Sequence, residues 1–242
     1  LIDEQAGERI LFCTVNSLWW RGENYYDLWW RSRWETEGGG CLINHAVHHV
    51  DLLQWMVGMP SKVTAVISNN AHRNSECEDL AIAILQYPGM TAQLTASLLP
   101  HGEEQKMIFQ AEKARFSIPW KSVAFRQLEN GFPVEDTEFL QLVQDKYNSI
   151  PEIGLEGHPA QIKNFLDAIQ GKDKLLIDGR EGRKAIKLII AIYKSACTGV
   201  TVELPISPDD DFYHGEKMLK LVPRFHEKTT SKDNFNTNVI TL

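Results

Sequence analysis

The sequence predicts an α/β (α+β) fold in which a mostly antiparallel sheet has helices packed on one face. Strand-like runs at 79–87 and 90–99 flank Pro88-Gly89, a turn signal that predicts a β-hairpin and therefore antiparallel pairing. In the second run small polar residues alternate with apolar ones, and alternate side chains of a strand point to opposite faces. One face of the sheet is therefore expected to be apolar and covered by helices, and the other small and polar. The polar face takes Thr91, Gln93, Thr95 and Ser97, and the apolar face takes Ala92, Leu94, Ala96 and Leu98.

Local patterns predict the remaining elements. Further strands are expected at 9–19, 62–68, 105–112, 114–120 and 200–205, with irregular structure or short helix at 22–37. Three helices are expected, at 43–57, 158–171 and 178–199.

Capping residues mark the ends of these helices. Gly58 follows the first helix and Gly199 the third. Asp178 is the expected N-cap of the third helix, with Glu181 three residues later as in a capping box. The second helix has Pro159 in its first turn. Its apolar residues share one face, namely Ile162, Phe165, Leu166 and Ile169.

The composition is that of a globular protein, with 242 residues, 43% of them hydrophobic, and a net charge of -7. The negative charge gives no electrostatic reason to expect nucleic acid or an anionic membrane as a partner. No apolar run reaches the length of a membrane span. The four scattered cysteines lack a C-x-x-C pair and are expected to be reduced thiols in the cytoplasm. We expect one domain over 1–242, with 207–242 as a peripheral tail.

Residues 38–58, GGGCLINHAVHHVDLLQWMVG, carry the strongest indication of a functional site. A glycine run lets the backbone approach another group closely or adopt a positive φ. In the helix that follows, Asn44, His48 and Asp51 are expected on one stripe, because residues three or four apart are neighbours. A second stripe, which is fully apolar, is expected to dock on the sheet, and it consists of Ala46, Val50, Leu53 and Val57. His48 would then have a hydrogen-bond partner on each side, which suits a general acid or base.

Three other interpretations of this stretch stay open. His48 can be a structural histidine that is satisfied in a partly buried site. A metal site could use His45, His48 and Asp51, although the H-E-x-x-H pattern is absent. A nucleophilic pair of Cys41 with a histidine would need the thiol to face the pocket.

Aromatic and arginine residues gather before the glycines, in SLWWRGENYYDLWWRSRW. Such rings can form a core or an interface, or a pocket wall that stacks against a sugar. The arginines can bind hydroxyls, carboxylates or phosphates, or can form surface ion pairs. They are Arg21, Arg31 and Arg33.

In this order, the motifs resemble the C-terminal half of the Gfo/Idh/MocA oxidoreductases. The resemblance starts at the first strand and is strongest at 38–58. It also includes RGENYYDLWWR (21–31), EDLA (78–81), LTAS (94–97), EGH (156–158) and IDGREGR (177–183), and it extends to about Tyr213.

The resemblance implies a large, mostly antiparallel open sheet whose free face often joins subunits, so a homo-oligomer is expected. It implies a partner N-terminal Rossmann domain that binds NAD or NADP, and a sugar, polyol or related hydroxy compound as substrate. His48 matches the histidine of the family motif, and Asn44 stands where many members have an aspartate. Both are expected to be catalytic. The expected substrate-binding residues are Arg21, Tyr26, Trp30, Arg31 and His45.

The sequence contains no G-x-G-x-x-G, no P-loop and no Glu-Lys-Pro. We therefore expect the chain to be the C-terminal part of a longer protein, to bind no NAD(P) alone and to lack dehydrogenase activity alone. The alternative is a non-catalytic sugar-binding or assembly module on the same fold.

Overall fold

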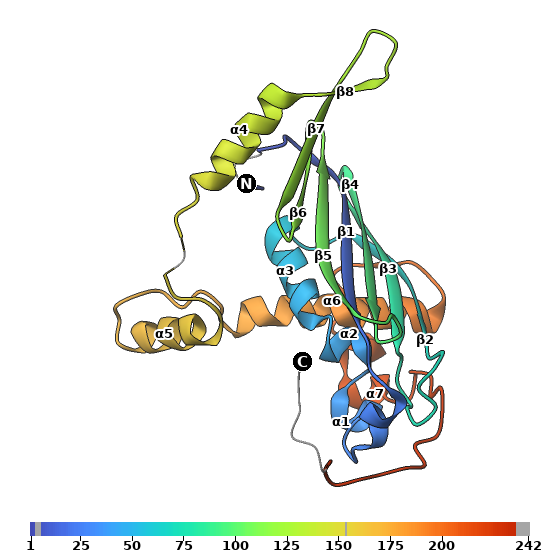
Figure 1. Ribbon diagram of the computed structural model, residues 1–242. Coiled ribbons are helices and arrows are strands. Elements are labelled where there is room, and N and C mark those ends of the chain that lie inside the picture. Colours follow the sequence, from blue (N-terminus) through green and yellow to red (C-terminus); the bar gives the residue numbers. More distant parts are fainter. Residues whose placement is uncertain (3–5, 153, 236–242) are drawn as a thin grey trace.

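A computed structural model describes residues 1–242 except 3–5, 153 and 236–242. The described residues form a nine-stranded sheet with the order β8-β7-β6-β5-β1-β4-β3-β2-β9 (Figure 1). The strands are β1 (Ile10–Trp19), β2 (Lys62–Ser68), β3 (Leu80–Tyr87), β4 (Met90–Ser97), β5 (Glu103–Ala111), β6 (Ala114–Ile118), β7 (Lys121–Gln127), β8 (Pro133–Glu135) and β9 (Val202–Glu203). Neighbouring strands are antiparallel except β1 and β4, which are parallel at the centre of the sheet. The predicted fold class and the hairpin around Pro88-Gly89 are confirmed.

Helices lie on one side of this sheet and in the segments at its lower end (Figure 1). They are η1 (Glu23–Asp27), α1 (Trp34–Glu37), α2 (Cys41–Asn44), α3 (Val47–Val57), α4 (Thr137–Asn148), α5 (Gly157–Ile169), α6 (Gly179–Thr198), η2 (Asp211–Tyr213) and α7 (Gly215–Met218). Asp178 caps α6 by accepting hydrogen bonds from the amides of Arg180 and Glu181, as predicted. The predicted strand at 200–205 is reduced to the two residues of β9.

The covered face of the sheet packs against α6 and α3. Small and branched side chains of the central strands, such as Val15, Ala83 and Leu94, are fully buried there. Ser195 on α6 fastens the helix to the sheet, since its hydroxyl accepts from the amide of Ala65 in β2 and donates to the carbonyl of Val200. This packing fixes the side of the sheet on which the 38–58 segment lies.

The open face is more apolar than the sequence of one strand predicts. Along β4 it carries the expected threonines and glutamine, but the neighbouring strands add large apolar side chains. Phe12 in β1 and Ile84 in β3 are both exposed on it, and Val66 in β2 is 62% exposed. The prediction rested on the alternation of polar and apolar residues in β4 alone. The open face also includes residues of the neighbouring strands, and these are more often apolar.

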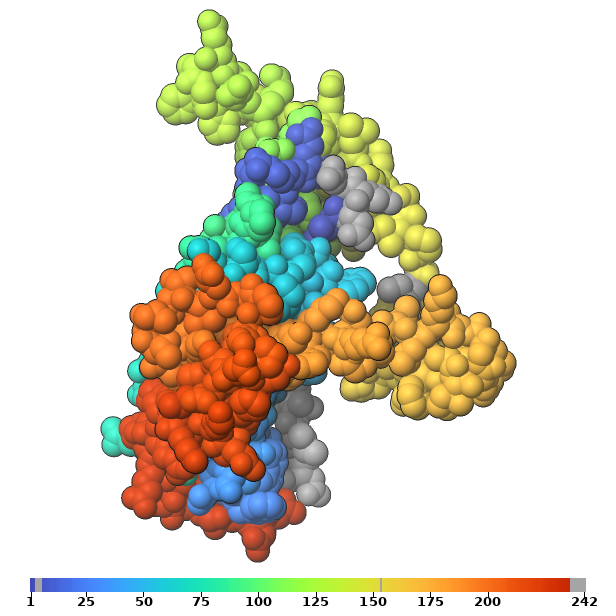
Figure 2. Space-filling model, turned by 180° about the vertical axis from the view of Figure 1, so that it is seen from behind, coloured from blue at the N-terminus to red at the C-terminus, as the bar shows by residue number. Residues whose placement is uncertain are grey.

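An arm made of α4, α5 and their connections projects from the sheet (Figures 1 and 2). The predicted helix at 158–171 is confirmed as α5, but none of its described residues is buried. Its apolar face is exposed to solvent, with Phe165 54% exposed. The arm therefore has an amphipathic helix whose apolar face packs on no other part of the described chain.

The segment after Ser207 runs over the surface of the lower body (Figure 1). It forms no core of its own among the described residues, but Phe212, Met218 and Val222 are buried in the main core. Asn74 ties it to the body by accepting from the amides of Thr229 and Thr230. The last part of the predicted tail, 236–242, lies outside the described residues.

Candidate functional site

The three glycines form a bend that only glycine can make without strain. Gly38 and Gly39 have φ values of 77° and 151°. A Cβ on Gly39 would lie 2.0 Å from the Tyr193 hydroxyl, and one on Gly40 would lie 1.9 Å from the Glu78 carbonyl oxygen. The glycine run thus provides both a positive φ and a close approach, as expected.

A buried carboxylate holds this bend. Glu78 Oε2 accepts from the amide of Gly40 at 2.9 Å, and Oε1 accepts from the amide of Leu42 at 3.1 Å and from the Tyr193 hydroxyl at 2.9 Å. The amide of Cys41 donates to the backbone carbonyl of Glu78 at 3.1 Å. Burial raises the pKa of Glu78 to about 7, against the lowering effect of these hydrogen bonds.

We expect Glu78→Gln to flatten the pH dependence of stability. The folded-state pKa of about 7 exceeds the ordinary value of 4.5, so this group's stabilisation is complete below pH 4.5 and is lost as pH rises through 7. The loss amounts to about 3 kcal/mol. Denaturant unfolding of both proteins from pH 4.5 to 8 measures it, and parallel curves would contradict the assignment. Glu35→Gln, at an exposed position on α1, is the matched control.

The helix predicted at 43–57 is interrupted. It ends as α2 at Asn44 and resumes as α3 at Val47. Between them the amide of Ala46 donates to the carbonyl of Cys41, five residues earlier, at 3.0 Å. This is the hydrogen bond of a π-type turn, a feature frequent at functional sites. Of the predicted apolar stripe, Ala46, Val50 and Leu53 are fully buried, and Val57 is half-buried against the same core.

The interruption separates His48 from its expected partners. The Asn44 amide nitrogen donates to the carbonyl of Gly39 at 3.0 Å, and Asp51 accepts from Gln54 at 3.0 Å. Within the described parts of the chain His48 has no hydrogen-bond partner, and it is exposed. The imidazole is therefore a surface group rather than a satisfied core histidine.

Cys41 does not fit the nucleophilic alternative. Its side chain is fully buried, and its thiol donates to the carbonyl of Ala96 at 3.4 Å. Burial raises its pKa well above the usual value, so it is a thiol rather than a thiolate. Among the described residues, no three potential metal ligands lie close enough together to hold an ion. The predicted set of His45, His48 and Asp51 is therefore not brought together.

Beside the bend, side chains of the predicted substrate-binding set gather around the ring of Tyr25. The Arg31 guanidinium lies 3.9 Å from the centre of this ring and the Arg21 guanidinium 5.6 Å from it. Trp30 covers Arg31 at 4.2 Å, and His45 Nε2 lies 3.3 Å from the Tyr25 hydroxyl. We call Arg21, Tyr25, Trp30, Arg31 and His45 the Tyr25 cluster.

His45 is neutral in this cluster. Burial, followed by the nearby charges of Arg21 and Arg31, lowers its pKa to about 4. It can therefore donate or accept a hydrogen bond at neutral pH, but it carries no charge there.

Tyr26 lies behind the cluster rather than within it. Its side chain is buried, and its ring packs edge-on against Tyr25 and against His72. Tyr25, which the sequence analysis does not single out, is the ring that contacts the arginines and His45. The two neighbours alternate in direction within η1, so the sequence motif alone does not distinguish them.

His72 supports the loop from below, although its sequence context gives no signal for this role. Its Nδ1 lies 2.8 Å from Asp79 Oδ2, and its Nε2 lies 2.9 Å from the carbonyl of Arg21. Asp79 also accepts from the amides of Asn70 and Ala71, so it is a carboxylate. Both partners are acceptors, and His72 is consequently an imidazolium. Burial is the largest single effect and opposes this charge. The hydrogen bonds that the ring donates to Asp79 and to the carbonyl of Arg21, together with the charge of Asp79, outweigh it, and the pKa is raised.

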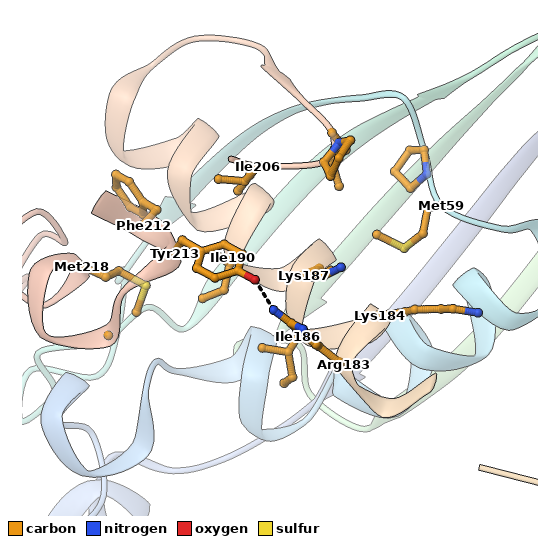
Figure 3. A pocket seen from close by; sticks show the side chains of 14 residues that line it. Met59, Arg183, Lys184, Ile186, Lys187, Ile190, Ile206, Phe212, Tyr213 and Met218 are labelled. Atoms are coloured by element: carbon orange, nitrogen blue, oxygen red, sulfur yellow. Dashed lines mark hydrogen bonds between the residues drawn. The ribbon is translucent and has the colours of Figure 1, made fainter. Parts of the chain in front are cut away.

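A cavity of about 570 Å³ lies elsewhere, between α6 and the 204–218 segment (Figure 3). Apolar side chains such as Ile190 and Phe212 line it, and Arg183 donates to the Tyr213 hydroxyl at its edge. None of the predicted site residues lines it. The predicted site residues thus lie apart from this cavity.

Comparison with known families identifies the family to which the chain belongs. The model of the oxidoreductase family C-terminal α/β domain, Gfo/Idh/MocA, matches residues 1–204. The chain therefore belongs to the Gfo/Idh/MocA oxidoreductase family, as a C-terminal α/β domain. No curated protein matches it. In the part of the chain that the structure describes, no helix is long and apolar enough to cross a bilayer.

Solved structures agree with this assignment. The chain is similar to the WlbA dehydrogenase from Bordetella pertussis in complex with NADH and UDP-GlcNAcA, with 30% identity, 85% of this chain and 60% of that chain covered, and a TM-score of 0.67. It is also similar to the WlbA dehydrogenase from Chromobacterium violaceum, again in complex with NADH and UDP-GlcNAcA. That match has 28% identity, covers 85% of this chain and 58% of that chain, and has a TM-score of 0.66. Aldose-aldose oxidoreductase from Caulobacter crescentus has 21% identity, with 84% of this chain and 58% of that chain covered and a TM-score of 0.61. At this identity the likeness is one of fold alone. The chain spans about 60% of the length of these proteins.

Proposed function

We propose that this chain is the substrate-binding domain of an NAD(P)-dependent oxidoreductase that acts on a sugar, polyol or related hydroxy compound. The observation that carries the proposal is the exposed imidazole of His48, which follows the glycine bend and lies close in sequence to the Tyr25 cluster. The similarity to two WlbA dehydrogenases supports it, because both were solved with NADH and a nucleotide sugar.

In the proposed mechanism His48 takes the proton of the substrate hydroxyl while hydride leaves the same carbon. Asn44 and the Tyr25 cluster orient the sugar. NAD(P), bound by a partner Rossmann domain, supplies the hydride acceptor. The residues of this chain include no nucleotide-binding glycine loop, so none of them is assigned to the coenzyme.

We expect His48→Ala in the full-length protein to lower kcat about 10²-fold or more, the size of a general acid–base contribution. The measurement is NAD(P) reduction on a panel of sugars and nucleotide sugars. His214→Ala, which removes another exposed histidine far along the chain, is the matched control. Turnover of the His48 variant at the wild-type rate would remove this residue from the mechanism.

One observation favours a non-catalytic alternative. Asn44 cannot hold a charge, and its amide is turned back to the carbonyl of Gly39. If the full-length protein binds sugars without reducing NAD(P), the binding-module function replaces the enzymatic one.

We also propose that the apolar face of α5 docks on the Rossmann domain. Matched structures are longer than this chain, and this helix face has no described cover. Phe165→Asp should leave the unfolding temperature of this chain nearly unchanged, because the side chain is already exposed. In the full-length protein we expect it to lower the unfolding temperature by several degrees.

Lys172→Asp, an exposed charge change just beyond α5, is the control for this comparison. Equal responses of the two proteins to Phe165→Asp, measured by differential scanning calorimetry, would contradict docking through this face.

Finally, we propose that the open face of the sheet pairs with a second copy of the chain. Its apolar side chains, including Val66, support this. Sedimentation velocity should show a dimer or larger assembly that Val66→Lys dissociates. Trp55→Lys, at an exposed apolar position on α3, which packs on the covered face, should have no effect. A monomer at high concentration would refute the pairing.

A further inference from the structure

We propose that Arg21, Arg31 and His45 form a subsite for an anionic group, a carboxylate or a phosphate, carried by the sugar substrate. The proposal rests on the proposed function, since it names the substrate class of the same site. Three features of the Tyr25 cluster carry it: a guanidinium held between rings, a guanidinium without a counter-ion, and buried polar atoms without partners.

Arg31 is held in a fixed orientation by aromatic rings. Its guanidinium lies 3.9 Å from the centre of the Tyr25 ring and 4.2 Å from that of Trp30. Aromatic rings that stack on the faces of a guanidinium leave the N–H groups at its edges free to donate hydrogen bonds. Its ion-pair partner in the described chain is Glu37, at 3.4 Å, and its Nε is buried without a partner. The donors of Arg31 are therefore largely unused.

Arg21 adds a second positive charge without a carboxylate. Its guanidinium lies over the rings of Trp19 and Tyr25 and donates to the carbonyl of Trp20 at 2.7 Å. Among the described residues it forms no ion pair. The two arginines thus have one nearby carboxylate between them, Glu37, whose oxygens also accept from the amide of Ser32.

His45 supplies a neutral donor at the same place. Nδ1 of His45 is buried without a partner in the described chain. In the tautomer whose Nε2 accepts from the Tyr25 hydroxyl, Nδ1 carries the ring hydrogen and is the unpaired donor. A buried donor without an acceptor is destabilising. An oxyanion that accepts from this hydrogen or from the edges of the guanidinium groups forms charge-assisted bonds.

The test uses ligands that differ by one anionic group. Titration calorimetry of the full-length protein compares UDP-GlcNAcA with UDP-GlcNAc, which lacks the sugar carboxylate, and GlcNAc 1-phosphate with GlcNAc, which lacks the phosphate. We expect one of these differences to be at least tenfold in Kd. A difference in the first pair identifies the carboxylate as the group bound, and one in the second pair identifies the phosphate.

We expect Arg31→Met to remove most of that difference, and Arg21→Met to reduce it. Arg180→Met, at an exposed position on α6, should preserve it. Circular dichroism and the affinity for neutral GlcNAc show whether each variant keeps its fold and its sugar site. The proposal is overturned if Arg31→Met leaves both differences intact, or if neither anionic group improves binding to the wild type.

Failure of the subsite and failure of the enzymatic function give different results. Turnover of a sugar by the full-length protein, with an affinity for the anionic ligands that does not depend on Arg31, would refute the subsite and leave the oxidoreductase standing. Binding of the anionic ligand through Arg31 without NAD(P) reduction would refute the enzyme and leave the subsite standing.

Discussion

The buried carboxylate of Glu78 is the contact on which the geometry of the candidate site depends. It joins three parts of the chain, because it stands just before β3, accepts from the glycine bend and accepts from Tyr193 on α6. A carboxyl group can be buried in this way only when its oxygens are satisfied. The bend in turn sets where α2 begins. His45 and His48 follow within eight residues of Gly40, so their positions depend on a group 30 residues further along the chain.

Most of the sheet and the two long C-terminal helices could be predicted from local patterns. The strand at 62–68 has the predicted bounds, and α6 begins at its predicted cap. The elements that the sequence analysis did not predict are β7, β8, α4 and the two short helices of the C-terminal segment, η2 and α7. β7 and β8 are mostly exposed and have weak alternation, so they lack the period-two signal by which a half-buried strand is recognised. The parallel pairing of β1 with β4 joins strands about 80 residues apart, and no local pattern encodes it.

The site was predictable in its residue types but not in its contacts. The glycine run indicated a close approach of the backbone to another group. In the structure those groups are the Tyr193 hydroxyl and the Glu78 carbonyl oxygen. The helical spacing failed between Asn44 and His48, because the π-type turn at Ala46 inserts a residue into the period. The roles of Tyr25 and His72 depend on side-chain direction and on long-range partners. A pair such as His72 and Asp79 becomes visible only when the loop after β2 folds back beside the start of β3.

The two parts of the site differ in how firmly the chain holds them, and this bears on how the proposed reaction would work. The Tyr25 cluster is built rigidly, with Arg31 held between rings and the Arg21 backbone held by the His72 imidazolium. His48 has no such support from the described residues. In the proposed reaction, binding energy from the cluster would fix the sugar, and the substrate hydroxyl would then orient the imidazole of His48. A proton acceptor that is oriented by its own substrate does not itself select one hydroxyl of the sugar. That selection would depend on how the rest of the sugar fits the Tyr25 cluster, so specificity would reside in the cluster and proton transfer in His48.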